Sequence, residues 1–118
     1  MEHLGIAELE SGIDEVRRSP KDTGTVELIV RRPNTEAREV LDEAELDPVE
    51  GLLGDNWRTR GSGATEDGSA HPGMQLTLMN ARFVDLVAGS RERWPLAGDQ
   101  LYVDFDLSEH NLPPGTRL

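Results

Sequence analysis

The chain has 118 residues, a formal net charge of −11 from 23 acidic and 12 basic residues, and no cysteine. This length fits one domain, and the absence of cysteine excludes disulfides and cysteine-based zinc sites. The acidic balance argues against a nucleic-acid partner, because phosphate-backbone binding depends on Lys and Arg. No apolar run approaches the roughly 20 residues of a membrane span, and the N-terminus lacks the basic and apolar regions of a signal peptide. We therefore predict a cytoplasmic protein with no membrane partner.

The first part of the chain predicts a helix followed by a β-hairpin. Apolar residues recur there at helical spacing, at Ile6, Leu9, Ile13 and Val16. This pattern predicts a short helix on the outside of the domain, so residues 1–23 form a helical lead-in. Residues 25–32 (TVELIVRR) are β-branched and alternating, which predicts a strand, and residues 37–44 are expected to return as its partner.

The middle of the chain is rich in turns. Asp47-Pro48 predicts a helix cap followed by a single helical turn. Residues 57–60 are expected to form a short strand. Residues 61–73 form a polar, glycine-rich loop, and loops of that length in compact domains are either functional or disordered.

Residues 75–89 predict a strand that leads directly into a helix. Residues 75–79 alternate as a strand does. Asn80 is placed to cap a helix that runs to Ala88 and stops at Gly89. The expected inward-facing residues of this helix are Phe83, Leu86 and Val87.

The last segment predicts one further strand, at residues 101–105, and the start of another at residues 116–118, where the chain ends. Several short strands with glycine-rich turns between them are typical of an all-β barrel. The predicted fold class is therefore mainly β.

The arginines are the most suggestive chemical feature. Arg58 and Arg60 alternate with other residues, so they would point the same way on a strand, and Arg82 follows the strand ending at residue 79. In so acidic a chain, basic side chains that converge on one rim predict a site for phosphate or carboxylate. The alternative is a set of isolated surface salt bridges, each worth about 0–1 kcal/mol, and the sequence leaves both open. With no catalytic motif and no histidine pair at zinc-site spacing, we predict no catalytic residues and no metal ligands.

Four segments resemble, in order and spacing, the motifs of one family. They are Gly51-Leu52-Leu53-Gly54-Asp55, similar to "G-(L/V/I)-x-G-D"; residues 75–82 (QLTLMNAR), similar to a strand leading into a helix; Gly98-Asp99-Gln100-Leu101, where the family has Gly-Glu-Asn-Leu; and residues 106–118, similar to the approach to a "G-x-x-L-x-I-G" strand. The family is that of MOSC domains, named after the C-terminal domain of molybdenum-cofactor sulfurase, and the likeness is to its small stand-alone bacterial members. The resemblance implies that residues 24–118 are the N-terminal part of a single MOSC-like domain. It also implies an incomplete β-barrel with an N-terminal helix and one or two short helices.

The resemblance further implies a module that binds molybdenum cofactor and its molybdenum ion, or that carries activated sulfur. Pyridoxal phosphate is associated with the family, although no lysine motif here supports it. The matched motifs imply ligand contacts by Asp55, Asn80, Asp99 and Gln100, and the charge argument adds Arg58, Arg60 and Arg82. The family's cysteine is absent, so the sequence leaves open whether the chain is an enzyme.

Two alternatives belong to other classes of protein. One is a non-catalytic, truncated domain that lacks the family's cysteine. The other is an acidic interaction module that pairs an open sheet edge with a partner, including a second copy of itself.

Overall fold

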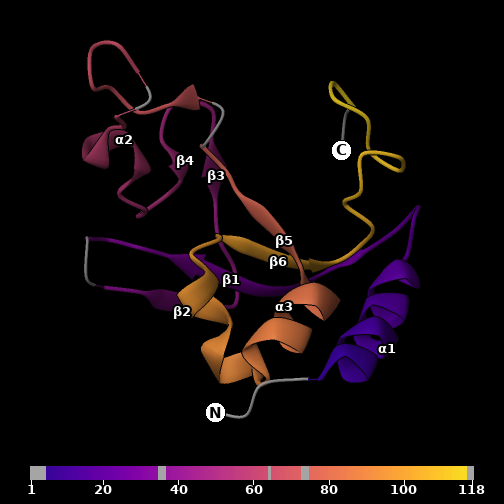
Figure 1. The fold of residues 1–118 in the computed structure, drawn as a ribbon. Coiled ribbons are helices and arrows are strands. Elements are labelled where there is room, and N and C mark those ends of the chain that lie inside the picture. The colour runs from indigo at the N-terminus through magenta and orange to yellow at the C-terminus, as the bar shows by residue number, and fades with distance from the viewer. Residues whose placement is uncertain (1–4, 35–36, 64, 73–74, 117–118) are drawn as a thin grey trace.

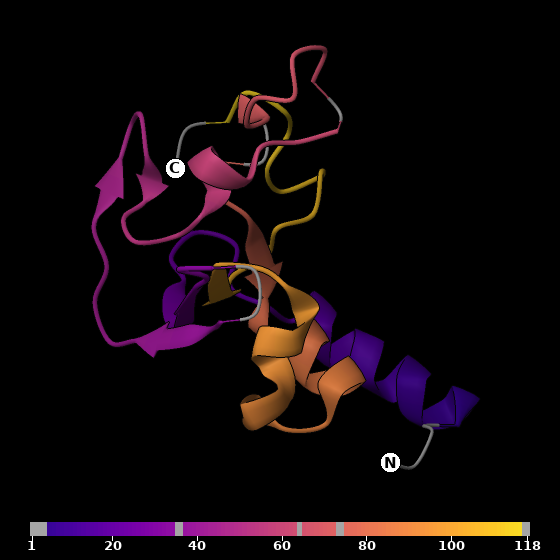
Figure 2. The same cartoon turned by 90° about the vertical axis from the view of Figure 1, so that its left-hand side faces the viewer.

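A four-stranded mixed sheet forms the centre of the computed structural model, which describes residues 5–34, 37–63, 65–72 and 75–116. Its strands are β2 (Glu39–Leu41), β1 (Thr25–Arg31), β6 (Leu101–Asp104) and β5 (Leu78–Asn80), in that spatial order. β1 lies antiparallel to β2 and β6, and β5 runs parallel to β6 (Figure 1). A small antiparallel pair, β3 (Leu46–Asp47) and β4 (Gly51–Leu52), stands with the short helix α2 (Trp57–Arg60) at one end of this sheet (Figure 2).

Helices pack against one side of the sheet. The helix α3 (Ala81–Ala88) follows β5 directly, and it ends at Gly89, which adopts the left-handed conformation that favours glycine. The 3₁₀ helix η2 (Arg91–Ala97) comes next. The N-terminal helix α1 (Ile6–Arg17) lies beside α3, so close that a Cβ atom at Gly12 would clash with the side chain of Leu86. No helix in the described ranges is both long and apolar enough to cross a bilayer.

The hydrophobic core lies between the sheet and the helices α3 and η2. It consists of Val30 and Tyr102 from the sheet, Ala81 and Val84 from α3, and Trp94 from η2. The rings of Trp94 and Tyr102 lie 5.9 Å apart, and the fully buried Tyr102 hydroxyl donates to the Trp94 carbonyl at 2.9 Å. Packing of this kind fixes η2 against β6. The loop between them, residues 98–100, is therefore anchored at both ends.

The predicted mainly β barrel is wrong. More of the described residues lie in helices than in strands, and within the described ranges β2 and β5 are free edges of an open sheet. The physical reason is strand length: β2 to β6 are two to four residues long, and a barrel needs strands long enough to tilt and stagger around a closed ring. The strand expected to begin at residue 116 falls partly on residues 117 and 118, which lie outside the described residues.

The predicted strand at residues 57–60 is also wrong, because these residues form α2. The Asp55 carboxylate accepts a hydrogen bond from the Trp57 N–H at 3.1 Å, and the Arg60 N–H donates to the Asn56 carbonyl at 2.8 Å. A four-residue segment shows too little periodicity to separate a strand from one helical turn. Here the contacts of Asp55 decide the conformation.

Asp47-Pro48 does not begin a helix. Asp47 Oδ1 accepts from the backbone N–H groups of Val49 and Glu50, at 2.8 and 2.9 Å, and this turn joins β3 to β4. Aspartate stabilises turns and helix starts through the same side-chain contacts. The sequence signal was therefore real, but it marks a hairpin turn.

On α3, the predicted inward face is wrong in part. Ala81 and Val84 are buried, whereas Phe83 and Val87 are 43% and 55% exposed. The predicted extent of this helix and its cap at Asn80 are confirmed, as are the N-terminal helix, the hairpin of β1 and β2, and the strand β6. The strand predicted at residues 75–79 is confirmed only at its end, because β5 begins at Leu78.

Candidate anion-binding site

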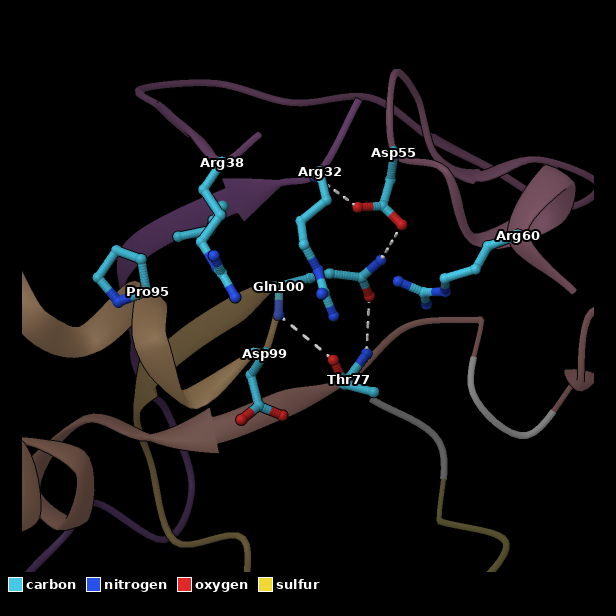
Figure 3. A pocket seen from close by; sticks show the side chains of 10 residues that line it. Arg32, Arg38, Asp55, Arg60, Thr77, Pro95, Asp99 and Gln100 are labelled. Carbon is cyan, nitrogen blue, oxygen red and sulfur yellow. Dashed lines mark hydrogen bonds between the residues drawn. The ribbon is translucent and has the colours of Figure 1, made fainter. Parts of the chain in front are cut away.

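Several loops meet at one end of the sheet because of its strand directions. β1 is antiparallel to β6, and β6 is parallel to β5, so the end of β1 lies beside the starts of β5 and β6. Arg32, Thr77 and Gln100 occupy those three positions, and the segment after β4 adds Asp55 and Arg60. These residues line a cavity of about 90 Å³, together with Val30, Arg38, Pro95, Gly98 and Asp99 (Figure 3). We call this cavity the arginine cleft.

Asp55 holds the wall of the arginine cleft together. One of its carboxylate oxygens accepts from the Arg32 backbone N–H at 2.7 Å. The other accepts from the Trp57 N–H at 3.1 Å and from the Gln100 side-chain amide at 3.0 Å. A single carboxylate thus joins the end of β1, the start of α2 and the start of β6 through three hydrogen bonds.

Gln100 forms the floor of the cleft and is 7% exposed. Its side-chain oxygen accepts from the Thr77 N–H at 2.9 Å, and its backbone N–H lies 3.3 Å from the Thr77 hydroxyl oxygen. Its backbone carbonyl accepts from the Val30 N–H at 2.8 Å. With its side-chain oxygen bound to Thr77 and its side-chain nitrogen bound to Asp55, Gln100 positions the loops of the cleft.

Three guanidinium groups are directed into the cleft, from Arg32, Arg38 and Arg60 (Figure 3). Arg60 also donates to the side-chain oxygen of Asn56 at 3.2 Å, which helps to hold it in place. Within the described ranges, no carboxylate lies within 4.0 Å of any of the three. Every other described Lys or Arg except Arg93 forms an ion pair, so the cleft gathers guanidinium groups that are not in direct contact with a described carboxylate.

Asp99 contributes a second carboxylate to the cleft. Burial raises the pKa of its carboxyl group, and a hydrogen bond with the Thr77 hydroxyl acts in the opposite direction. In Figure 3 the Asp99 carboxylate lies below the guanidinium groups, on the Thr77 side of the cavity. Beneath the cleft, burial and the nearby charge of Asp99 raise the pKa of Tyr102 to about 12, so this hydroxyl stays neutral and serves the core.

The structure brings four of the seven predicted site residues into the cleft: Asp55, Arg60, Asp99 and Gln100. The other three lie elsewhere. Arg58 is exposed and pairs with Glu50, and Arg82 binds Asp104 through two hydrogen bonds, of 2.8 and 3.4 Å.

Asn80 has a structural role outside the cleft. Its side-chain oxygen accepts from the Phe83 N–H at 2.9 Å and caps α3. Its amide nitrogen donates to the Phe105 carbonyl at 2.8 Å and to the Ser19 hydroxyl at 2.9 Å. These contacts tie α3, β6 and the end of α1 together, and they leave none of the Asn80 side chain for a ligand.

Sequence reasoning did not select Arg32, Arg38 or Thr77. A signal for Arg32 existed, because it ends the predicted strand immediately before Pro33 and therefore had to lie at a sheet edge. The pairing that brings this edge to Gln100 joins residues far apart in the chain, and no local pattern reports it.

The described residues were compared with the needs of the cofactors that the family resemblance implies: a metal ion, pyridoxal phosphate and the phosphate of molybdenum cofactor. The described ranges contain no group of three or more histidine, aspartate or glutamate side chains able to hold a metal ion. Lys21 is the only lysine in the sequence, and it donates to Asp106 at 2.7 Å, away from the cleft. A phosphate group is the one part of such a cofactor that the cleft's donors suit.

No protein-family model, curated protein or solved structure matches this chain. The geometry of the arginine cleft is therefore the basis for a functional proposal.

Proposed function

We propose that the chain binds a small, phosphate-bearing ligand in the arginine cleft. The observation that carries this proposal is the convergence of Arg32, Arg38 and Arg60 on one cavity, with no carboxylate of the described residues in ion-pair contact with them. Guanidinium groups bind phosphate through paired, charge-assisted hydrogen bonds. In a chain of net charge −11, such a local cluster is needed to hold an anion at all.

The size of the cleft limits what enters it. Pockets that enclose drug-sized ligands have volumes of roughly 300–1,000 Å³, whereas this cavity measures about 90 Å³. The cleft therefore takes one anionic group, and the rest of a larger ligand would lie outside. Because Arg38 and Arg60 are exposed, binding is expected to weaken as salt concentration rises.

The resemblance to MOSC domains supplies one ligand of this class, the phosphate-bearing pterin of molybdenum cofactor. Its phosphate would lie against Arg32, Arg38 and Arg60, and the bound cofactor would supply the molybdenum chemistry. The sulfur-carrier role has no support in these 118 residues, because they contain no thiol. Pyridoxal phosphate has support only through its phosphate, because Lys21 is paired with Asp106.

An NMR titration with inorganic phosphate tests this proposal. We expect saturable shifts of the backbone amides of residues 98–100, of Arg32 and of residues 55–57, because these segments form the cleft wall. The amide of Arg93, an arginine outside the cleft, should not move in a saturable way. Absence of saturable shifts in the cleft would refute the proposed function.

A second candidate function is self-association, which one feature of the sheet favours. β5 pairs only with β6 among the described strands, and a groove of about 370 Å³ lies next to it, lined mainly by Val26, Leu78, Val103, Phe105 and Leu107. A second copy that pairs along β5 would satisfy the free edge and cover these apolar side chains. Sedimentation velocity over a concentration series tests this candidate, and a monomer at every concentration would exclude it.

A further inference from the structure

The arginine cleft contains charges of both signs that do not pair with each other. Asp99 lines the same cavity as Arg32, Arg38 and Arg60. Among the described residues, however, no cationic group lies within 4.0 Å of its carboxylate. Figure 3 shows the guanidinium groups around the Gln100 side chain and the Asp99 carboxylate below them.

The position of Asp99 is fixed by its neighbours in the chain. Gly98, with φ +88°, ends η2, and its N–H donates to the Pro95 carbonyl at 3.2 Å. Gln100 is anchored by Asp55 and Thr77. The backbone of Asp99 is therefore held on both sides, and its carboxylate is hydrogen-bonded to the Thr77 hydroxyl.

A carboxylate that is partly withdrawn from water without a cation is unfavourable. Burial accordingly raises the pKa of Asp99. A bound ammonium group would reverse this effect, because an opposite charge nearby stabilises the ionised carboxylate. A ligand that carries both a phosphate and an ammonium group would therefore suit the three arginines and Asp99 together.

We propose that the arginine cleft recognises a phosphate-bearing amine, with the phosphate on the guanidinium groups of Arg32, Arg38 and Arg60 and the ammonium group on the carboxylate of Asp99. This inference rests on the proposed function and adds the class of ligand. The connection between the two groups must be short, because Asp99 and the three arginines line the same small cavity.

Two probes separate the contribution of the amine from that of the phosphate. O-phosphoethanolamine carries both groups, and propyl phosphate has a methyl group in place of the ammonium group with almost the same shape. Isothermal titration calorimetry with the native protein should show that O-phosphoethanolamine binds about tenfold more tightly, the scale expected for one charge-assisted contact. The variant Asp99→Asn should bind both probes about equally and should still bind propyl phosphate.

Asp42→Asn is the matched control, because Asp42 is exposed and does not line the cleft. It should keep the preference of the native protein for the amine. Equal binding of the two probes by the native protein would overturn the inference and leave phosphate binding intact. That result is expected if Arg38, which is exposed, folds onto Asp99 in solution. A preference that persists in Asp99→Asn would also overturn it, and absence of binding by both probes would refute the proposed function as well.

Discussion

Asp55 is expected to be the residue on which the shape of the arginine cleft depends most. Its carboxylate accepts three hydrogen bonds, from the Arg32 N–H, the Trp57 N–H and the Gln100 amide, at 2.7, 3.1 and 3.0 Å. The substitution Asp55→Asn keeps the size of the side chain. It replaces one acceptor oxygen with an NH₂ group that faces a donor, whichever way the amide is turned.

The cost follows from the hydrogen bonds lost. A hydrogen bond to a charged group contributes about 1.5–3 kcal/mol, and an unsatisfied buried donor adds its own penalty. At least one of the three bonds is lost and the rest lose their charge, so we expect a loss of about 3 kcal/mol in the free energy of unfolding. That is a large part of the roughly 5–15 kcal/mol that stabilises a typical domain.

Urea unfolding followed by tryptophan fluorescence measures this loss directly, because buried Trp57 and Trp94 are the only two tryptophans. For a slope near 2 kcal/mol per molar urea, the midpoint should fall by about 1.5 M. Asp42→Asn makes the same chemical change at an exposed position and should stay within about 0.5 kcal/mol of the native protein. A loss below about 1 kcal/mol for Asp55→Asn would show that the three contacts do not hold the cleft together.

Three further predictions concern residues outside the ligand contacts. Asn80→Ala should cost about 2 kcal/mol in urea unfolding, because Asn80 caps α3 and donates two further hydrogen bonds; Asn80→Asp, which keeps the cap, should cost less, and equal costs would contradict the capping role. Arg82→Met should leave the affinity for phosphate, measured by calorimetry, unchanged, because Arg82 binds Asp104. A loss of affinity would show that Arg82 takes part in phosphate binding. Tyr102 is the only tyrosine, so the absorbance of tyrosinate should titrate near pH 12 in the native protein and near 10 in the unfolded chain. The native state then holds the proton more tightly, so this part of the stability is complete below pH 10 and is lost as the pH rises towards 12; a native midpoint near 10 would contradict it.

Elements with strong local signals could be predicted from the sequence. The helix α3 is an example, since Asn80 and Gly89 mark its ends through contacts within a few residues. The inward face of α3 was harder to predict. The apolar residues on this helix cover more than one side, and only the position of the sheet decides that Val84 is buried while Phe83 is exposed.

The candidate site could be predicted only in part, for a related reason. Asp55, Asp99 and Gln100 were identified within segments that resemble known motifs, whereas Arg32 and Arg38 reach the cleft through the long-range pairing of β1. The mainly β, barrel-like fold was expected from the number of strand-like segments. Strand number alone does not set the curvature of a sheet, and these strands are too short to close a ring.

The most direct test of the arginine cleft is a calorimetric titration with propyl phosphate of the native protein, Arg32→Gln and Arg93→Gln. Both substitutions remove one positive charge, but Arg32 lines the cleft and Arg93 does not. If the cleft is the binding site, Arg32→Gln should lose about tenfold in affinity and Arg93→Gln should match the native protein. Equal affinities for all three proteins, or no saturable binding by the native protein, would contradict this account.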